Sequence, residues 1–159
     1  MGTKITKNEN TKYENIKYED CIPFIPPLTE GVVVKVYDGD TITIASKMPW
    51  KDSPYYRFSI RINGIDCPEI RTQNENEKKC AFIARDLLQT KLMNKIVTLK
   101  NVSLEKYGRI LADVFIGEED ISKMLLKENL AVVYHGGKKQ CPDDWYDYYM
   151  KNKITDEYS

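Results

Sequence analysis

The feature that most restricts the fold of this chain is a regular alternation of apolar and polar residues over residues 56–63. The apolar positions are Tyr56, Phe58, Ile60 and Ile62, and the polar positions are Arg57, Ser59, Arg61 and Asn63. A period of two residues is typical of a β-strand that turns one face to the core and the other to solvent. We therefore expect Arg61 to lie on the polar face of a strand.

Other segments predict further short strands. Strand-like patterns occupy residues 41–44, 96–104 and 109–116, with turn residues between them. A strand is also expected from residue 31 onward, with three valines of the same parity on one face: Val32, Val34 and Val36. Residues 130–134 form a last strand-like segment.

Helical spacing interrupts this series between the third and fourth strands. Over residues 78–94, apolar residues recur at spacings of three and four, namely Ala81, Ala84, Leu88 and Leu92. A shorter helix is expected after Asp120, whose side chain can cap it. This order predicts an α+β, mainly β fold: a five-stranded Greek-key barrel of the OB type with one inserted helix and one or two further short helices.

The chain of 159 residues divides into a domain and two tails. Residues 1–30 are polar, end in a proline-rich stretch, and are expected to form an N-terminal extension or arm. Residues 31–135 carry the strand and helix patterns of one domain. Residues 136–159 are an acidic, aromatic-rich C-terminal tail, either a docked helix or a solvated end.

Several protein classes are excluded by composition. No apolar run is long enough to span a bilayer, and the N-terminus has no signal-peptide pattern, so we expect an intracellular protein without a membrane span. The four cysteines include no C-x-x-C pair, which favours free thiols. A single histidine makes a His/Cys zinc site improbable. Nothing indicates an obligate protein partner, although the arm and tail leave a structural role in an assembly open.

Positive charge is concentrated in the middle of the chain. The 24 Lys and Arg balance the 24 Asp and Glu overall, but residues 55–113 carry 11 of the former and 7 of the latter. This distribution predicts a weakly basic groove rather than strong nonspecific adhesion to nucleic acid.

Two aspartates follow turns at strand ends and could form a metal site. Asp40 follows the turn at Asp38-Gly39, and Asp66 follows Asn63-Gly64. If both turns meet at one rim of the barrel, their carboxylates offer the hard oxygen ligands that suit Ca²⁺ or Mg²⁺.

Three more residues complete the groups needed to cleave a phosphodiester. Glu69 could remove a proton from an attacking water, and Arg61 and Arg109 offer planar guanidinium groups for phosphate oxygens. Taken singly, each residue could equally be a turn former or a solvated surface charge. Their coincidence favours an active site, provided that the fold brings them together.

Three blocks make the chain resemble the staphylococcal nuclease (thermonuclease) family over roughly residues 31–135. They are Asp38-Gly39-Asp40-Thr41, the run from Arg61 to Glu69, and Lys106-Tyr107-Gly108-Arg109. Each block is weak alone, and their order with a helix between the last two is specific. The resemblance implies the same OB-type barrel with helices.

The resemblance also implies residue roles. Asp40, Asp66 and the backbone carbonyl of Cys67 would bind Ca²⁺, with Mg²⁺ or Mn²⁺ as possible substitutes. Glu69 would be the general base or water-orienting group, and Arg61 and Arg109 would neutralise the phosphate in the transition state. Substrate contacts would come from four further residues: Lys106, Tyr107, Tyr134 and His135. Cys67 stands where the family often has threonine.

The activity implied is calcium-dependent endonucleolytic hydrolysis of DNA and RNA with little sequence preference, leaving 3′-phosphate ends. Single-stranded or locally melted nucleic acid would be the preferred partner, because exposed bases can stack on aromatic side chains. The alternative is a catalytically weak or inactive module of the same fold that binds nucleic acid or a peptide.

Overall fold

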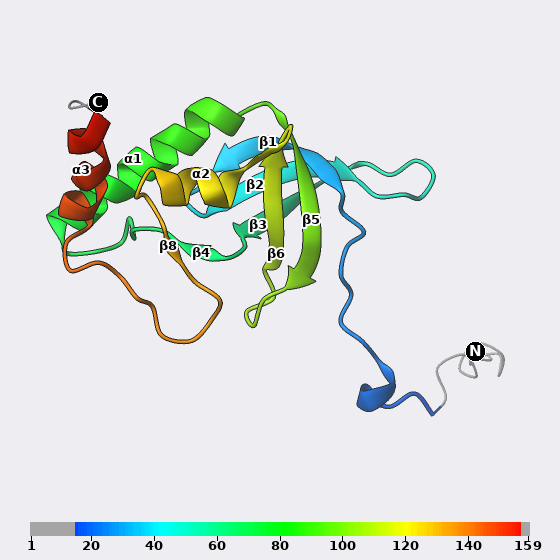
Figure 1. Ribbon diagram of the computed structural model, residues 1–159. Coiled ribbons are helices and arrows are strands. Elements are labelled where there is room, and N and C mark those ends of the chain that lie inside the picture. Colours follow the sequence, from blue (N-terminus) through cyan, green and yellow to red (C-terminus); the bar gives the residue numbers. More distant parts are fainter. Residues whose placement is uncertain (1–14, 157–159) are drawn as a thin grey trace, which may run out of the picture.

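A computed structural model describes residues 15–156 of the chain, which form a β-barrel flanked by three helices (Figure 1). The strands are β1 (Glu30–Val36), β2 (Thr41–Lys47), β3 (Tyr55–Ile62), β4 (Ile65–Asp66), β5 (Ile96–Leu104), β6 (Ile110–Ile116), β7 (Glu119–Asp120) and β8 (Val132–Val133). The helices are α1 (Glu75–Leu92), α2 (Ile121–Lys127) and α3 (Trp145–Asp156).

Five main strands close into a barrel. Their order in the sheet is β3-β2-β1-β5-β6, with short β7 at the end of the series, and a parallel pairing of β3 with β6 closes the ring. All other neighbouring strands are antiparallel. The predicted mainly β, OB-like barrel with an inserted helix is therefore confirmed.

The pattern expected for the first strand is wrong in one respect. Val33 and Val36 are buried, whereas Val34 is 38% exposed, so the three valines of equal parity do not share one face. The pairing of β1 with β2 shifts register between Val33 and Lys35. A bulge at this point inserts one extra residue and exchanges the two faces of the strand, which simple alternation does not reveal.

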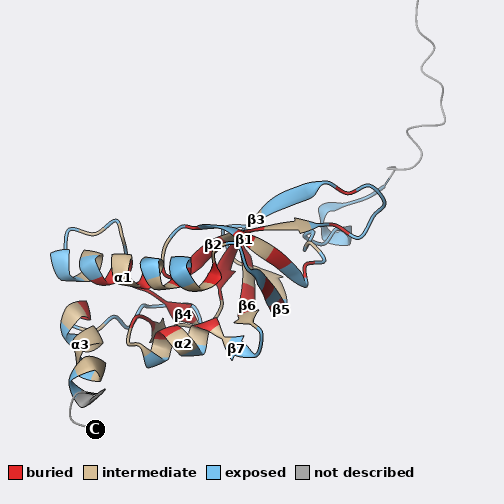
Figure 2. Ribbon diagram, turned by 90° about the horizontal axis from the view of Figure 1, so that it is seen from above, coloured by how far each residue is buried: buried red, intermediate tan, exposed pale blue. Residues whose placement is uncertain are grey.

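Helix α1 lies against the barrel and begins earlier than its apolar spacing indicates. Asn74 caps the helix by accepting a hydrogen bond from the Glu77 N–H at 2.9 Å, so the polar residues 75–77 belong to its first turn. Three of its buried residues belong to the hydrophobic core, namely Ala84, Leu88 and Leu92, and Cys80 and Ala81 are buried as well. Figure 2 shows the buried residues gathered in the barrel strands and on one side of this helix.

Two later elements fix the end of the barrel. The Asp120 side chain accepts the N–H of Lys123 at 3.2 Å, which confirms its predicted role as the cap of α2. The predicted last strand is reduced to β8, and it pairs with β4 in a separate two-stranded sheet. Because Asp66 lies opposite Val132 in this pair, β8 holds one of the candidate metal ligands in place.

The C-terminal tail contains a helix that packs on α1. Trp145 at the start of α3 is buried, and the ammonium group of Lys79 lies 4.0 Å from the ring centroid of Tyr146. The side chain of Asn129, after α2, donates to the carbonyl of Tyr148 at 2.8 Å. Of the two possibilities for the tail, the structure has the docked helix.

The expected N-terminal arm falls partly outside the described residues, which begin at residue 15. From there to residue 27 the chain extends away from the barrel, with a short 3₁₀ turn at Tyr18–Asp20 (Figure 1). Leu28 is buried, and β1 begins two residues later. No helix between residues 15 and 156 combines the length and apolar character needed to cross a bilayer. All four cysteines are free thiols.

We predict that Gly39→Ala destabilises the protein. A Cβ atom at residue 39 would lie 2.9 Å from the Cβ atoms of both Ala84 and Cys67, closer than packed carbons allow. Overpacking of this kind costs about 1–3 kcal/mol. Thermal denaturation should show a melting temperature lower by several degrees.

A double-mutant cycle identifies the cause. Ala84→Gly removes one of the three atoms that would crowd a Cβ at residue 39, so Gly39→Ala should cost less in that background than in the wild type. Strictly additive effects would show that close packing of the Asp40 turn against α1 is not responsible.

Candidate active site

Two turns bring Asp40 and Asp66 together at one rim of the barrel. Asp40 lies between β1 and β2, and its carbonyl accepts the N–H of Ile62 at the end of β3, at 2.8 Å. Its Oδ2 accepts the N–H of Cys67, the residue after Asp66, at 3.1 Å. The Thr41 hydroxyl donates to Asp40 Oδ1, also at 3.1 Å. Hydrogen bonds thus join the turn that carries Asp40 to the end of β3 and to the residue that follows β4.

Arg61 lies between the two carboxylates. Its Nη2 is 3.4 Å from Asp40 Oδ2 and 3.1 Å from Asp66 Oδ1, and its Nη1 donates to the Ile62 carbonyl at 2.8 Å. Arg61 is on the polar face of β3, opposite Ile60 and Ile62, as its alternation indicates. This face is nevertheless buried here, because the segments that carry Asp40 and Asp66 cover it. The exposed fraction is 8% for Asp40, 3% for Asp66 and 8% for Arg61.

The buried group of Asp40, Asp66 and Arg61 contains two carboxylates and only one guanidinium group. Loss of solvent raises the pKa of Asp40 to about 6, although the charge of Arg61 opposes the change. Burial also raises the pKa of Asp66, although the nearby ammonium group of Lys139 opposes the change. The buried Oδ2 of Asp66 receives no well-oriented hydrogen bond. An unsatisfied buried carboxylate oxygen beside a second carboxylate is suited to a cation with oxygen preference.

Glu69 follows Asp66 by three residues, and a hydrogen bond from its backbone joins it to the first turn of helix α1. Its backbone N–H donates to Glu77 Oε1 at 3.0 Å, while Glu77 Oε2 accepts the Thr72 hydroxyl at 2.9 Å. The Glu69 side chain is 54% exposed and reaches solvent. Glu77 was not among the predicted site residues, and its place in the first turn of α1 is the only sequence signal for it.

Lys139 joins Glu69 to Asp66. Its Nζ is 2.6 Å from Glu69 Oε1 and 2.9 Å from Asp66 Oδ2; the second contact is an ion pair whose orientation falls short of a hydrogen bond. Lys139 comes from the loop between β8 and α3, and sequence reasoning missed it. Within residues 15–156, no three His, Cys, Asp or Glu side chains are grouped so that they could hold a metal ion.

Arg109 stands at the end of the turn between β5 and β6 and is bonded within that turn. Its guanidinium group forms an ion pair with Glu105, including an Nη2–Oε2 hydrogen bond of 3.1 Å. The hydrogen bond with Glu105 raises the pKa of Arg109, and the charges of Asp40 and Asp38 raise it further. Arg109 therefore lies within electrostatic range of the Asp40 turn, but its direct partner is Glu105, which sequence reasoning also missed.

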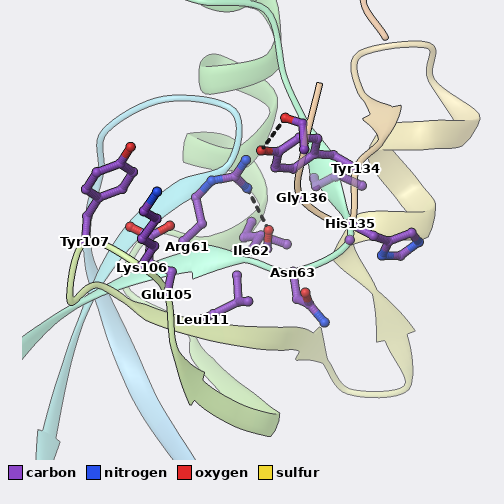
Figure 3. A pocket seen from close by; sticks show the side chains of 13 residues that line it. Arg61, Ile62, Asn63, Glu105, Lys106, Tyr107, Leu111, Tyr134, His135 and Gly136 are labelled. Carbon is purple, nitrogen blue, oxygen red and sulfur yellow. Dashed lines mark hydrogen bonds between the residues drawn. The ribbon is translucent and has the colours of Figure 1, made fainter. Parts of the chain in front are cut away.

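A pocket of about 540 Å³ opens beside Arg61. Figure 3 shows its lining, which includes all four predicted substrate-contact residues: Lys106, Tyr107, Tyr134 and His135. The Tyr134 ring lies toward Arg61, and its hydroxyl donates to the Gly137 carbonyl at 3.3 Å. The His135 ring points away from Arg61 (Figure 3). Tyr134 is therefore the better placed of the last two to meet a ligand in this pocket.

Cys67 turns its side chain into the core. It is 4% exposed, and burial raises the pKa of its thiol well above the ordinary value. Its sulfur packs near Gly39 and Ala84, away from solvent. Only the backbone of this residue faces the Asp40 carboxylate.

Comparison with known proteins agrees with this architecture. The model of the family described as "Staphylococcal nuclease homologue" matches residues 59–153, from within β3 to within α3. That match leaves β1, β2 and Asp40 outside it, and it includes the tail helix that the resemblance alone had left outside the domain.

Three relatives illustrate the similarity. A probable endonuclease of Schizosaccharomyces pombe is 32% identical over 53% of this chain and 43% of its own length. The thermonuclease of Staphylococcus hyicus is 35% identical over 62% of this chain and 56% of its own. A probable endonuclease of Saccharomyces cerevisiae is 36% identical over 57% and 35%. The chain thus spans about a third to just over half the length of these curated relatives.

The family model covers more than half of the chain, including the second and third sequence blocks and the helix inserted between them. The chain therefore belongs to the staphylococcal nuclease family.

Proposed function

We propose that this protein is a metal-dependent endonuclease that hydrolyses phosphodiester bonds of DNA and RNA, with Ca²⁺ as the preferred ion. The observation that carries the proposal is the buried group of Asp40, Asp66 and Arg61 beside a pocket lined by basic and aromatic residues. The names of the relatives, a thermonuclease and probable endonucleases, support the same class of reaction.

The donor set of the rim fits a divalent cation. Asp40 and Asp66 would supply carboxylate oxygens, and the backbone carbonyl of Cys67 would add a neutral one. The Asp66 Oδ2 atom supports this assignment, since it forms no hydrogen bond of good geometry and already lies 2.9 Å from a cation, the ammonium group of Lys139. Hard oxygen ligands suit Ca²⁺, and Mg²⁺ or Mn²⁺ could replace it. When bound, the ion would polarise the phosphate and neutralise its charge.

The side chains around the rim would then divide the work of hydrolysis. Glu69, which reaches solvent, would take a proton from the attacking water. The water oxygen would form a bond to phosphorus while the bond from phosphorus to the 5′ oxygen breaks. The departing 5′ oxygen would take a proton from solvent to become a 5′-hydroxyl, and the other fragment would keep a 3′-phosphate. Arg61 and Arg109 would stabilise the negative charge that develops on the phosphate oxygens.

The neighbouring pocket would bind the nucleotide. Lys106 offers an ammonium group for phosphate, and Tyr107, which is 82% exposed, offers an uncovered ring. Tyr134 lies toward Arg61 and could stack on a base (Figure 3). A base reaches such a pocket only when it is unpaired, so single-stranded or locally melted nucleic acid would be the better substrate.

A second function, a binding module with weak or no catalysis, is favoured by one observation. Glu69 is paired with Lys139, and Arg109 is paired with Glu105. An enzyme must release both pairs before these groups can act, whereas a binding module need not.

We predict that Glu69→Gln lowers the cleavage rate by roughly 100- to 10,000-fold, because the amide cannot accept a proton from water. Cleavage of denatured DNA in Ca²⁺ measures the rate, and calorimetry should show that metal binding is largely retained. Glu118→Gln, the same exchange at an exposed turn, should leave cleavage unchanged. A wild-type protein that cleaves nothing in Ca²⁺, Mg²⁺ or Mn²⁺ would instead favour the binding module.

We also predict that Ca²⁺ stabilises the fold. An ion that binds only the folded chain adds about 2.7 kcal/mol to the free energy of unfolding when present at 100 times its Kd. Thermal denaturation with Ca²⁺ and with a chelator measures the shift. Asp66→Asn should abolish it, whereas Asp86→Asn, the same exchange on the exposed face of α1, should retain it. Equal shifts in both variants would show that the ion binds elsewhere.

A further inference from the structure

Lys139 occupies the side of Asp66 that no other donor satisfies. Its Nζ lies 2.9 Å from Asp66 Oδ2, the oxygen without a hydrogen bond, and 2.6 Å from Glu69 Oε1. The Asp66 side chain is 4% exposed and the Lys139 side chain 40%, so the lysine reaches a buried carboxylate from the surface. It approaches from the loop between β8 and α3, opposite Arg61, which contacts the other carboxylate oxygen, Oδ1.

The charges of the rim explain why this contact matters. Asp40 and Asp66 carry two buried negative charges, and Arg61 supplies one positive charge. Lys139 supplies the second. The Lys139 ammonium group lies within 2.9 Å of both the Asp66 and the Glu69 carboxylate, and both favour its charged form. Removing that charge would leave an uncompensated carboxylate in a poorly solvated place, which is unfavourable.

A divalent cation and the ammonium group cannot both use the same oxygen. Calcium binds carboxylate oxygens at about 2.3–2.6 Å, so an ion on Asp66 Oδ2 would stand where Lys139 Nζ now lies and would repel it.

Lys139 follows two glycines, Gly136 and Gly137, whose φ angles are +93° and +85°. A Cβ at either glycine would meet no atom within 4 Å, so the backbone there has open space around it.

We propose that Lys139 is a positioning residue that stands in for the metal ion: it holds the Asp66 and Glu69 carboxylates together in the metal-free protein and is displaced when a divalent cation binds. This inference rests on the proposed metal site. Its consequence is that metal affinity is set by competition with a tethered cation as well as by the ligands themselves. Lys139 then makes both contacts: one to Glu69, which it positions, and one to Asp66, which the ion must replace.

Calorimetric titration with Ca²⁺ alone tests the competition. Lys139→Gln should bind Ca²⁺ about tenfold more tightly than the wild type or better, which corresponds to about 1.4 kcal/mol. Lys138→Gln, the same exchange at the exposed neighbouring residue, should leave the affinity unchanged. Lys139→Arg retains the charge and should bind Ca²⁺ much more weakly than Lys139→Gln.

Thermal denaturation adds a readout that a merely structural role would not produce. With a chelator present, Lys139→Gln should melt below the wild type, because Asp66 and Glu69 lose their cation. At saturating Ca²⁺ the difference should disappear, since the lysine is displaced in the wild type as well. A melting temperature lowered equally under both conditions would overturn the proposal. Lys139→Met, which keeps the aliphatic stem, replaces Lys139→Gln if the latter does not fold.

The outcomes separate this inference from the proposed function. Unchanged or weaker Ca²⁺ affinity in Lys139→Gln, with Ca²⁺ binding intact in the wild type and lost in Asp66→Asn, would refute the competition and leave the metal site standing. Absence of Ca²⁺ binding in both the wild type and Lys139→Gln would refute both.

Discussion

The arrangement of the rim depends on one buried guanidinium group, that of Arg61. Two carboxylates of almost no exposure lie within 3.4 Å of its Nη2 atom, and its positive charge favours the ionised form of both. Each charged group costs several kcal/mol to remove from water, and mutual attraction offsets that cost only while the geometry holds. The β2–β3 register, the bond from Ile62 to Asp40, and the β4–β8 pair all act to keep that geometry.

Long-range pairing therefore decides what the rim can do. The parallel pairing of β3 with β6 sets the Arg109 turn near Arg61, although the two arginines are distant in the chain. Pairing of β8 with β4 delivers the loop that carries Tyr134 and Lys139 to the other side. Helix α1, inserted between these strands, contributes Glu77 to hold the Glu69 backbone. The barrel strands thus act mainly by fixing the positions of the Arg109 turn and of the loop that carries Tyr134 and Lys139.

Sequence reasoning predicted the parts of this site that depend on local pattern. Alternation was enough to place Arg61 on the polar face of β3, and turn residues were enough to place Asp40 at a strand end. It could not find the bulge after Val33, because the extra residue has no compositional mark. Lys139 was missed for another reason: its partner Asp66 is brought near it only by the pairing of β8 with β4. Glu105 lies only four residues from its partner Arg109, but nothing in the sequence distinguishes this pair from two solvated charges in a turn.

The ion pairs of Glu69 and Arg109 suggest how metal and substrate would act in the proposed reaction. Two of the three groups assigned to catalysis have a partner of opposite charge outside the buried cluster: Glu69 has Lys139, and Arg109 has Glu105. A divalent cation carries the charge needed to replace Lys139, and a phosphate carries the charge needed to replace Glu105. Each ligand would exchange one ion pair for another, so neither group would be left without a counter-charge. In the proposed mechanism, metal and substrate together would release Glu69 and Arg109 from these pairs.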